Sequence, residues 1–155
     1  MSIEFVKKAI SLINENQDIA DFEGIEDNSL IDLAEETLSL KFPDSYRFFL
    51  KNLGCGDIAG EEFYGIINGN FNVLSVPNAI WLTLLERKES NLPDNYVVIY
   101  STGDGDYMVL DCNKNKKGLN EVKLWSPGVE EEFTFIPYFN DFGDFFYETI
   151  SNALD

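Results

Sequence analysis

The spacing of apolar residues changes twice along this chain, and those changes limit the folds that it can adopt. Up to residue 53, apolar side chains recur every three or four positions, as on the buried face of an α-helix. From residue 60 to residue 136, short apolar runs separated by turn residues take over, apart from one stretch of helical spacing over 79–88, and the helical spacing returns after residue 140. This order predicts an α+β fold with a mainly antiparallel central sheet, not a wound βαβ fold.

Three helices are predicted before residue 54. The first follows Ser2, which can cap a helix, and the second follows Asn28 or Ser29. The third begins near Pro43, whose fixed φ suits a first helical turn. The polar segment 14–26 is predicted to be a turn. The buried stripes are Ile3, Val6, Ile10 and Ile13, then Leu30, Leu33, Ala34, Thr37 and Leu38, then Tyr46, Phe49, Leu50 and Leu53.

The strands of the sheet are predicted in the middle of the chain. Two apolar runs, 96–100 and 107–110, flank Gly103-Asp104-Gly105, and glycine tolerates the positive φ that a hairpin loop requires. The helices are expected to cover one face of the sheet, with residues 1–155 forming a single domain. The other predicted elements are a strand over 63–67, a turn over 68–70, a helix over 79–88, strands over 121–125 and 133–136, and a last helix from Asn140 with Phe142, Phe146 and Ile150 on one face.

The net charge of -17, from 28 acidic and 11 basic residues, restricts the partners that this chain can bind. Such a field repels the phosphates of nucleic acids and anionic lipids, and it attracts cationic surfaces. Binding to nucleic acid or to a membrane is therefore not expected. Solubility alone can also account for an acidic surface, so the charge does not by itself identify a partner.

The two cysteines and the absence of histidine restrict the cellular location and the kinds of catalysis to be expected of this chain. Cys55 and Cys112 do not resemble a secreted disulfide framework, and neither lies in a CxxC pair. The N-terminus lacks the features of a signal peptide, and no apolar stretch approaches the ~20 residues that cross a bilayer. A cytoplasmic location is therefore expected. The chain has no histidine, which excludes Ser-His-Asp and Cys-His catalysis. We predict no bound metal and no cofactor.

Carboxylates are the remaining candidates for catalysis. A glycosidase pair or a magnesium site could in principle be formed by Glu61-Glu62, by Asp104 with Asp106, or by Glu130–Glu132. Neighbouring acids on a strand, however, point to opposite faces and do not make a paired site. A β-run follows Gly103–Asp106, so this loop lacks the helix N-terminus of a phosphate-binding loop. We predict no enzyme activity, with a carboxylate-based hydrolase as an alternative.

Trp125 is a candidate binding anchor. It lies at the end of the predicted strand 121–125, offset by one position from Val122 and Leu124. Its ring can therefore either pack in the core or face solvent or a groove, where aromatic rings often anchor a partner. The sequence leaves both interpretations open.

A series of short motifs resembles the SUKH superfamily, the fold family of the fungal Smi/Knr cell-wall regulators and of many bacterial immunity proteins. The resemblance covers roughly residues 3 to 150, and the order and spacing of the motifs carry it. Leu53 and Phe42 depart from the residues that the family often has there, and both are packing positions. The motifs are Glu35, Phe42–Leu50, Leu53–Gly56, Thr83–Arg87, Leu92-Pro93, Val97–Tyr100, Gly103-Asp104, Tyr107, Leu110-Asp111, Val122, Trp125 and Phe142–Phe146.

The resemblance implies an α+β framework and, for a stand-alone bacterial member, neutralisation of a toxin delivered by a neighbouring or sibling cell. Many such toxins are nucleases, whose basic groove an acidic inhibitor can fill. The sequence therefore predicts an immunity protein that binds a basic toxin domain without covalent chemistry. A regulatory scaffold that binds endogenous proteins is the alternative, and the oligomeric state stays open. The predicted partner-binding residues are Asp57, Glu61, Glu62, Asp104, Asp106, Trp125, Glu130, Glu131 and Glu132.

Overall fold

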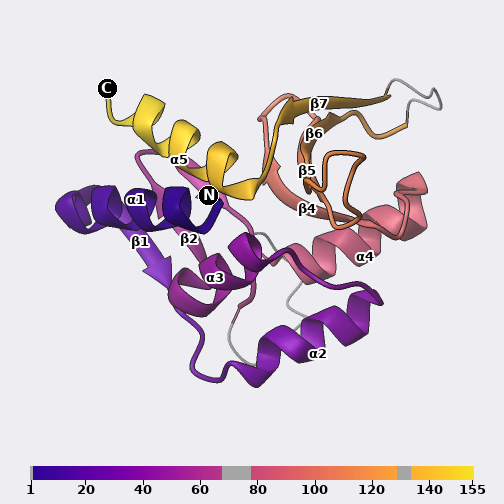
Figure 1. The fold of residues 1–155 in the computed structure, drawn as a ribbon, viewed down its shortest axis with the longest axis horizontal. Helices are drawn as coiled ribbons and strands as arrows, with labels where there is room; N and C mark the ends of the chain where they lie inside the picture. The colour runs from indigo at the N-terminus through magenta and orange to yellow at the C-terminus, as the bar shows by residue number, and fades with distance from the viewer. Residues whose placement is uncertain (1, 68–77, 129–133) are drawn as a thin grey trace.

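The computed structural model describes residues 2–67, 78–128 and 134–155, which form five α-helices and two small sheets (Figure 1). Three α-helices with one short strand between the first two make up the N-terminal part, and a closing helix ends the chain. The elements are α1 (Ser2–Glu15), the 3₁₀ turn η1 (Gln17–Ile19), β1 (Ala20–Glu23), α2 (Ser29–Leu38), α3 (Asp44–Leu53), β2 (Cys55–Ile58), β3 (Glu61–Phe63), α4 (Ala79–Ser90), β4 (Tyr96–Ser101), β5 (Tyr107–Asp111), β6 (Val122–Trp125), β7 (Phe135–Phe139) and α5 (Phe142–Ala153).

The strands form two antiparallel sheets rather than one central sheet. The first has the order β1-β2-β3 and the second the order β4-β5-β6-β7. The predicted α+β class is confirmed. The prediction of a turn over 14–26 is wrong, because β1 lies there and pairs with β2, with Ala20 opposite Ile58 and Glu23 opposite Cys55. The strand predicted over 63–67 is largely wrong, because β3 covers Glu61–Phe63 and shares only Phe63 with it. The turn predicted over 68–70 lies outside the described residues.

α5 joins the two sheets through a core of aromatic rings. Phe146 of α5 contacts Phe63 of β3 at 4.7 Å between ring centroids, and Phe145 contacts Tyr100 of β4 at 5.5 Å. The same helix packs on Phe49 of α3. In Figure 1, α5 and α1 lie side by side, and α4 packs along the four-stranded sheet. The Phe series of the last helix is therefore core, as its spacing indicates.

Gly143 sets the distance between α1 and α5. Its backbone N–H donates to Oγ of Ser2 at 3.0 Å. A Cβ at position 143 would lie 2.1 Å from the Ser2 carbonyl oxygen, a backbone atom that cannot move alone. Only glycine therefore lets the two helices approach this closely.

We expect Gly143→Ala to destabilise the protein by about 1–2 kcal/mol. Alanine has the better helix propensity by about 1 kcal/mol, but overpacking against backbone costs about 1–3 kcal/mol, and the clash should prevail. Urea unfolding followed by circular dichroism measures the change. Gly24→Ala is the control, because its nearest neighbour to a new Cβ is the Asn52 carbonyl oxygen at 3.8 Å. Equal midpoints for the two variants would contradict this packing.

Candidate functional site

The β1-β2-β3 sheet has one apolar face and one acidic face. Phe22, Ile58 and Phe63 alternate with polar residues along their strands. The rings of Phe22 and Phe63 stack on each other and both contact Phe146 of α5. Because side chains alternate between the faces of a strand, packing of this face on α5 directs the intervening side chains outward.

The outward face carries a line of carboxylates that crosses all three strands. Asp21 of β1 lies opposite Asp57 of β2, and Asp57 lies opposite Glu62 of β3. Glu23 lies on the same face, two residues from Asp21. We call these four residues the acidic row. Asp21 and Glu23 are exposed, and Asp57 and Glu62 are half-buried.

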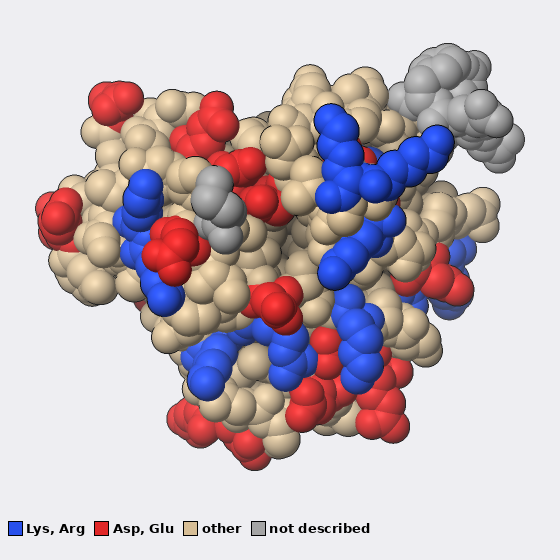
Figure 2. Space-filling model, in the orientation of Figure 1, with Lys and Arg blue, Asp and Glu red and all other residues tan. Residues whose placement is uncertain are grey.

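No base neutralises the acidic row within the described part of the chain. The ion pairs there join Lys and Arg to other acids, such as Lys123 to Asp111 and Arg47 to Glu35. On the face drawn in Figure 2, Lys and Arg side chains lie among Asp and Glu side chains. Burial, and then the charge of Asp57, raises the pKa of the Glu62 carboxyl. The row is thus a site of uncompensated negative charge.

The acidic row surrounds a buried thiol. Cys55 lies opposite Glu23 across the β1–β2 pair and is buried. Burial, with a smaller effect of the neighbouring carboxylates, raises the pKa of this thiol to about 11. The thiol therefore stays protonated at neutral pH and is a poor nucleophile.

Side-chain hydrogen bonds connect this sheet to the hairpin between β4 and β5. The Tyr100 hydroxyl donates a hydrogen bond to the Glu61 carboxylate, and Tyr64 shares a side-chain hydrogen bond with Ser101 at the end of β4. Glu61 and Glu62 thus point in different directions, as their adjacency on a strand predicts. The hairpin loop with Asp104 and Asp106 begins at the next residue after Ser101.

The hairpin loop has the predicted turn chemistry. Gly103 and Gly105 both have positive φ, at 91° and 97°. The Thr102 hydroxyl donates to the exposed Asp104 carboxylate, and this bond lowers the pKa of Asp104. The structure therefore places Asp57, Glu61 and Glu62 in one sheet and the loop acids beside that sheet's junction with β4.

Trp125 is not an exposed anchor. Its side chain is 3% exposed. It lies opposite Tyr107 and Phe135 across neighbouring strands, and its ring stacks on both, with centroids 6.1 Å and 6.0 Å away. Of the two interpretations that the sequence left open, the structure shows packing. Glu130, Glu131 and Glu132 lie outside the described residues.

Sequence reasoning missed two members of the acidic row, Asp21 and Glu23. They lie in the segment predicted to be a turn. The alternation Ala20-Asp21-Phe22-Glu23 is a strand signal, but it spans four residues within a polar stretch, which is too short to stand out.

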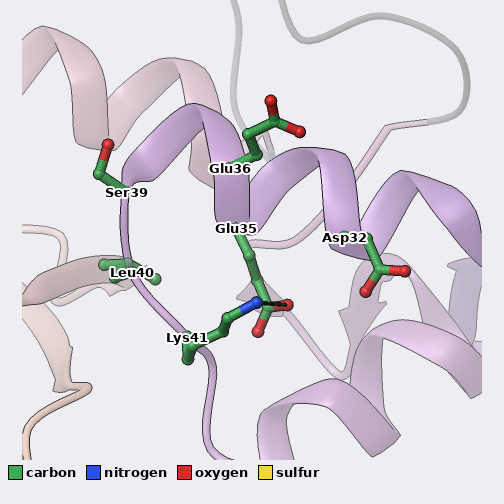
Figure 3. Close-up of a pocket in the computed structure, with 6 residues that line it drawn as sticks. All are labelled: Asp32, Glu35, Glu36, Ser39, Leu40 and Lys41. Carbon is green, nitrogen blue, oxygen red and sulfur yellow. Dashed lines mark ion pairs between the residues drawn. The ribbon is translucent and has the colours of Figure 1, made fainter.

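A hollow of about 570 Å³ beside α2 contains the most buried carboxylate of the helical part (Figure 3). Glu35 is 3% exposed. It accepts hydrogen bonds from the Phe42 backbone N–H at 2.7 Å and from Arg47 Nη1 at 2.5 Å, and Lys41 Nζ lies at 3.8 Å. Glu35 therefore fixes the α2–α3 loop. The hollow is lined by Asp32, Glu35, Glu36, Ser39, Leu40 and Lys41.

The acidic row is the main concentration of unpaired carboxylates described above. Among them, no three His, Cys, Asp or Glu side chains are placed to hold a metal ion together. None of the described helices is long and apolar enough to span a membrane. What the geometry can do is attract and hold positive charge on the acidic row.

These features define a small α+β protein whose three-stranded sheet carries carboxylates on its outer face. A family model described as SMI1-KNR4 cell-wall (SUKH_6) matches residues 28–146. Because the match covers most of the chain, the protein belongs to this family, and the resemblance seen in its motifs is confirmed. The match contains Glu35, Arg47, Asp57 and Glu62, whereas β1 lies before its first residue.

We expect Glu35→Ala to destabilise the protein by about 1–3 kcal/mol, because the buried Phe42 N–H loses its acceptor while the partly exposed Arg47 keeps only Asp32. Asp32→Ala is the matched control. Asp32 also contacts Arg47, at 3.2 Å, but its side chain is largely exposed, so its loss should cost under about 1 kcal/mol. Urea unfolding measures both variants, and a similar loss for the two would contradict the structural role of Glu35.

We expect Glu62→Gln to stabilise the protein at pH 7 by about 0.5 kcal/mol, since like charges lie opposite each other across the strands. Because the pKa of Glu62 is raised in the folded protein, the protonated carboxyl favours folding. This contribution to stability is fully present below the ordinary pKa of 4.5 and is lost as pH rises through the folded-state pKa. The gain from glutamine should therefore vanish below about pH 4.5. The control is Glu36→Gln, at an exposed position of α2. Thermal unfolding from pH 4 to 8 measures both variants. A gain for Glu62→Gln that does not change with pH would contradict the coupling between the carboxylates.

Proposed function

We propose that this protein is an immunity protein that binds a cognate toxin domain, a nuclease, and blocks its basic substrate-binding surface. The acidic row supports the proposal most strongly, because its carboxylates are exposed or half-buried and unneutralised by described bases. Family membership supports binding to a protein rather than catalysis.

The physical basis is charge complementarity. A nuclease must present positive charge to bind the phosphates of its substrate. Neighbouring strands lie about 4.8 Å apart, so Asp21, Asp57 and Glu62 offer three carboxylates along one rigid line. Complementary fields raise association rates toward 10⁸–10⁹ M⁻¹s⁻¹ at low salt, on the order of a hundredfold or more above neutral pairs. Fast capture suits a protein that must act before its own cell is damaged.

A regulatory scaffold is the second candidate, and the description of the matching family, which refers to the cell wall, favours it. Such a protein would bind endogenous partners through the same acidic row. The two proposals differ in what happens when the partner is expressed without this protein. A toxin domain kills or arrests the cell, and a regulatory partner does not.

The test is co-expression in bacteria with the C-terminal domain of a toxin encoded beside this gene. We expect the wild-type protein to restore growth and the fourfold variant Asp21→Asn, Glu23→Gln, Asp57→Asn, Glu62→Gln to protect at least about tenfold less well. The control removes the same number of charges from exposed helical positions, through Glu15→Gln, Glu36→Gln, Glu89→Gln and Glu148→Gln. Equal killing with and without the wild-type protein would refute the proposed function.

A further inference from the structure

Ile19 is an exposed apolar side chain at the end of the strand that carries half of the acidic row. It is 46% exposed and lies on η1, immediately before β1. Its carbonyl oxygen accepts a hydrogen bond from the Ala59 backbone N–H at 3.1 Å, which extends the β1–β2 pair by one position. Asp21, a member of the acidic row, is two residues further along the chain. Ile19 therefore lies beside the acidic row.

The turn that contacts Ile19 has a strained backbone. Ala59 and Gly60 form the connection between β2 and β3, and their φ angles are 52° and 85°. A two-residue hairpin turn of this kind usually begins with Asn or Gly, because a Cβ is disfavoured at positive φ. Ala59 is exposed, and residues held in such conformations occur mostly at functional sites. We call Ile19 and Ala59 the apolar corner.

The other exposed large apolar residues of the described chain lie on other elements. They are Leu33 on α2, Leu84 on α4, and Ile136 and Tyr138 on β7 of the four-stranded sheet. A single exposed apolar residue needs no explanation by itself. Ile19 differs from these residues because it is hydrogen-bonded to the sheet that carries the acidic row.

The charges around the apolar corner indicate which partner it fits. Asp18 precedes Ile19 on η1 and is exposed. Asp21 and Asp57 lie opposite each other on the first two strands, and none of these three acids forms an ion pair with a Lys or Arg of the described chain. A second copy docked at this corner would bring two such sets of carboxylates together, and an anionic membrane would be repelled in the same way. A partner with positive charge around an apolar contact is complementary to the corner.

We propose that the apolar corner is the hydrophobic contact of the interface with the cationic toxin domain, and that the acidic row forms the charged rim beside it. This inference rests on the proposed function. Protein interfaces concentrate binding energy in a few side chains that lose water on binding, surrounded by a polar rim. The corner and the row lie on one pair of hydrogen-bonded strands, so a partner surface of the standard size of about 800 Å² can cover both.

The apolar corner and the acidic row should affect different rate constants. Charges act on association and its salt dependence, because their field extends into solution. An apolar contact acts at short range after docking, so its loss accelerates dissociation. Removing the corner should therefore change dissociation, whereas removing the charges of the row should change association.

The experiment uses the catalytically inactivated toxin domain encoded beside this gene, immobilised for surface plasmon resonance. We expect Ile19→Ser to raise the dissociation rate constant about fivefold or more, with association changed less than about twofold. Ile19→Val keeps most of the apolar surface and should stay within about twofold of the wild type. Leu33→Ser on α2 is the matched control, because Leu33 is 48% exposed, and it should bind like the wild type.

Ala59→Asn tests the corner without weakening the fold. Asparagine tolerates positive φ better than alanine, so the turn is kept while a polar amide replaces the methyl group. The dissociation rate constant should rise about twofold or more. Circular dichroism checks that all variants fold.

Three results would overturn this role of the apolar corner. If the wild-type protein protects cells and binds the toxin, while Ile19→Ser and Ala59→Asn dissociate at the wild-type rate, the corner is wrong and the proposed function stands. If the wild-type protein neither binds nor protects, the proposed function fails and the corner fails with it. If sedimentation shows a wild-type dimer that Ile19→Ser dissociates, the corner binds a second copy instead.

Discussion

The register of the β1-β2-β3 sheet connects the core of this protein to its surface. Phe22, Ile58 and Phe63 must face α5, because their rings and methyl groups complete the aromatic core around Phe146. With side chains alternating along each strand, that requirement leaves Asp21, Asp57 and Glu62 no position except the outer face. A slip of one residue would bury the carboxylates and expose the rings, so core packing enforces the placement of the charge.

Carboxylates serve two separate purposes in this chain. Glu35 is buried and satisfied by a backbone N–H and a guanidinium, so it holds the α2–α3 loop and offers nothing to a partner. The acidic row has no such partners among the described residues, and burial together with the charge of Asp57 raises the pKa of its member Glu62. The repulsion within the row costs some stability, which a positively charged partner would recover on binding.

Much of the framework could be predicted from the sequence, because it depends on local spacing. The three N-terminal helices, the β4–β5 hairpin and α5 follow from apolar periodicity and turn glycines. β1 was missed because a four-residue strand in a polar segment carries little periodic signal. The division into two sheets and the burial of Trp125 depend on contacts between distant residues, such as Trp125 with Phe135, which local patterns do not specify. Asp57 and Glu62 were predicted as surface acids, but their alignment with Asp21 required the strand register.

The most direct test of the account is the association rate constant of the wild-type protein with its toxin domain, measured by stopped-flow fluorescence as ionic strength rises. The Debye length shrinks from about 30 Å at 0.01 M salt to about 8 Å at 0.15 M, so long-range attraction weakens across this range. If the acidic row steers the partner, the association rate constant should fall at least about tenfold. An association rate that is indifferent to salt would contradict a function based on surface charge.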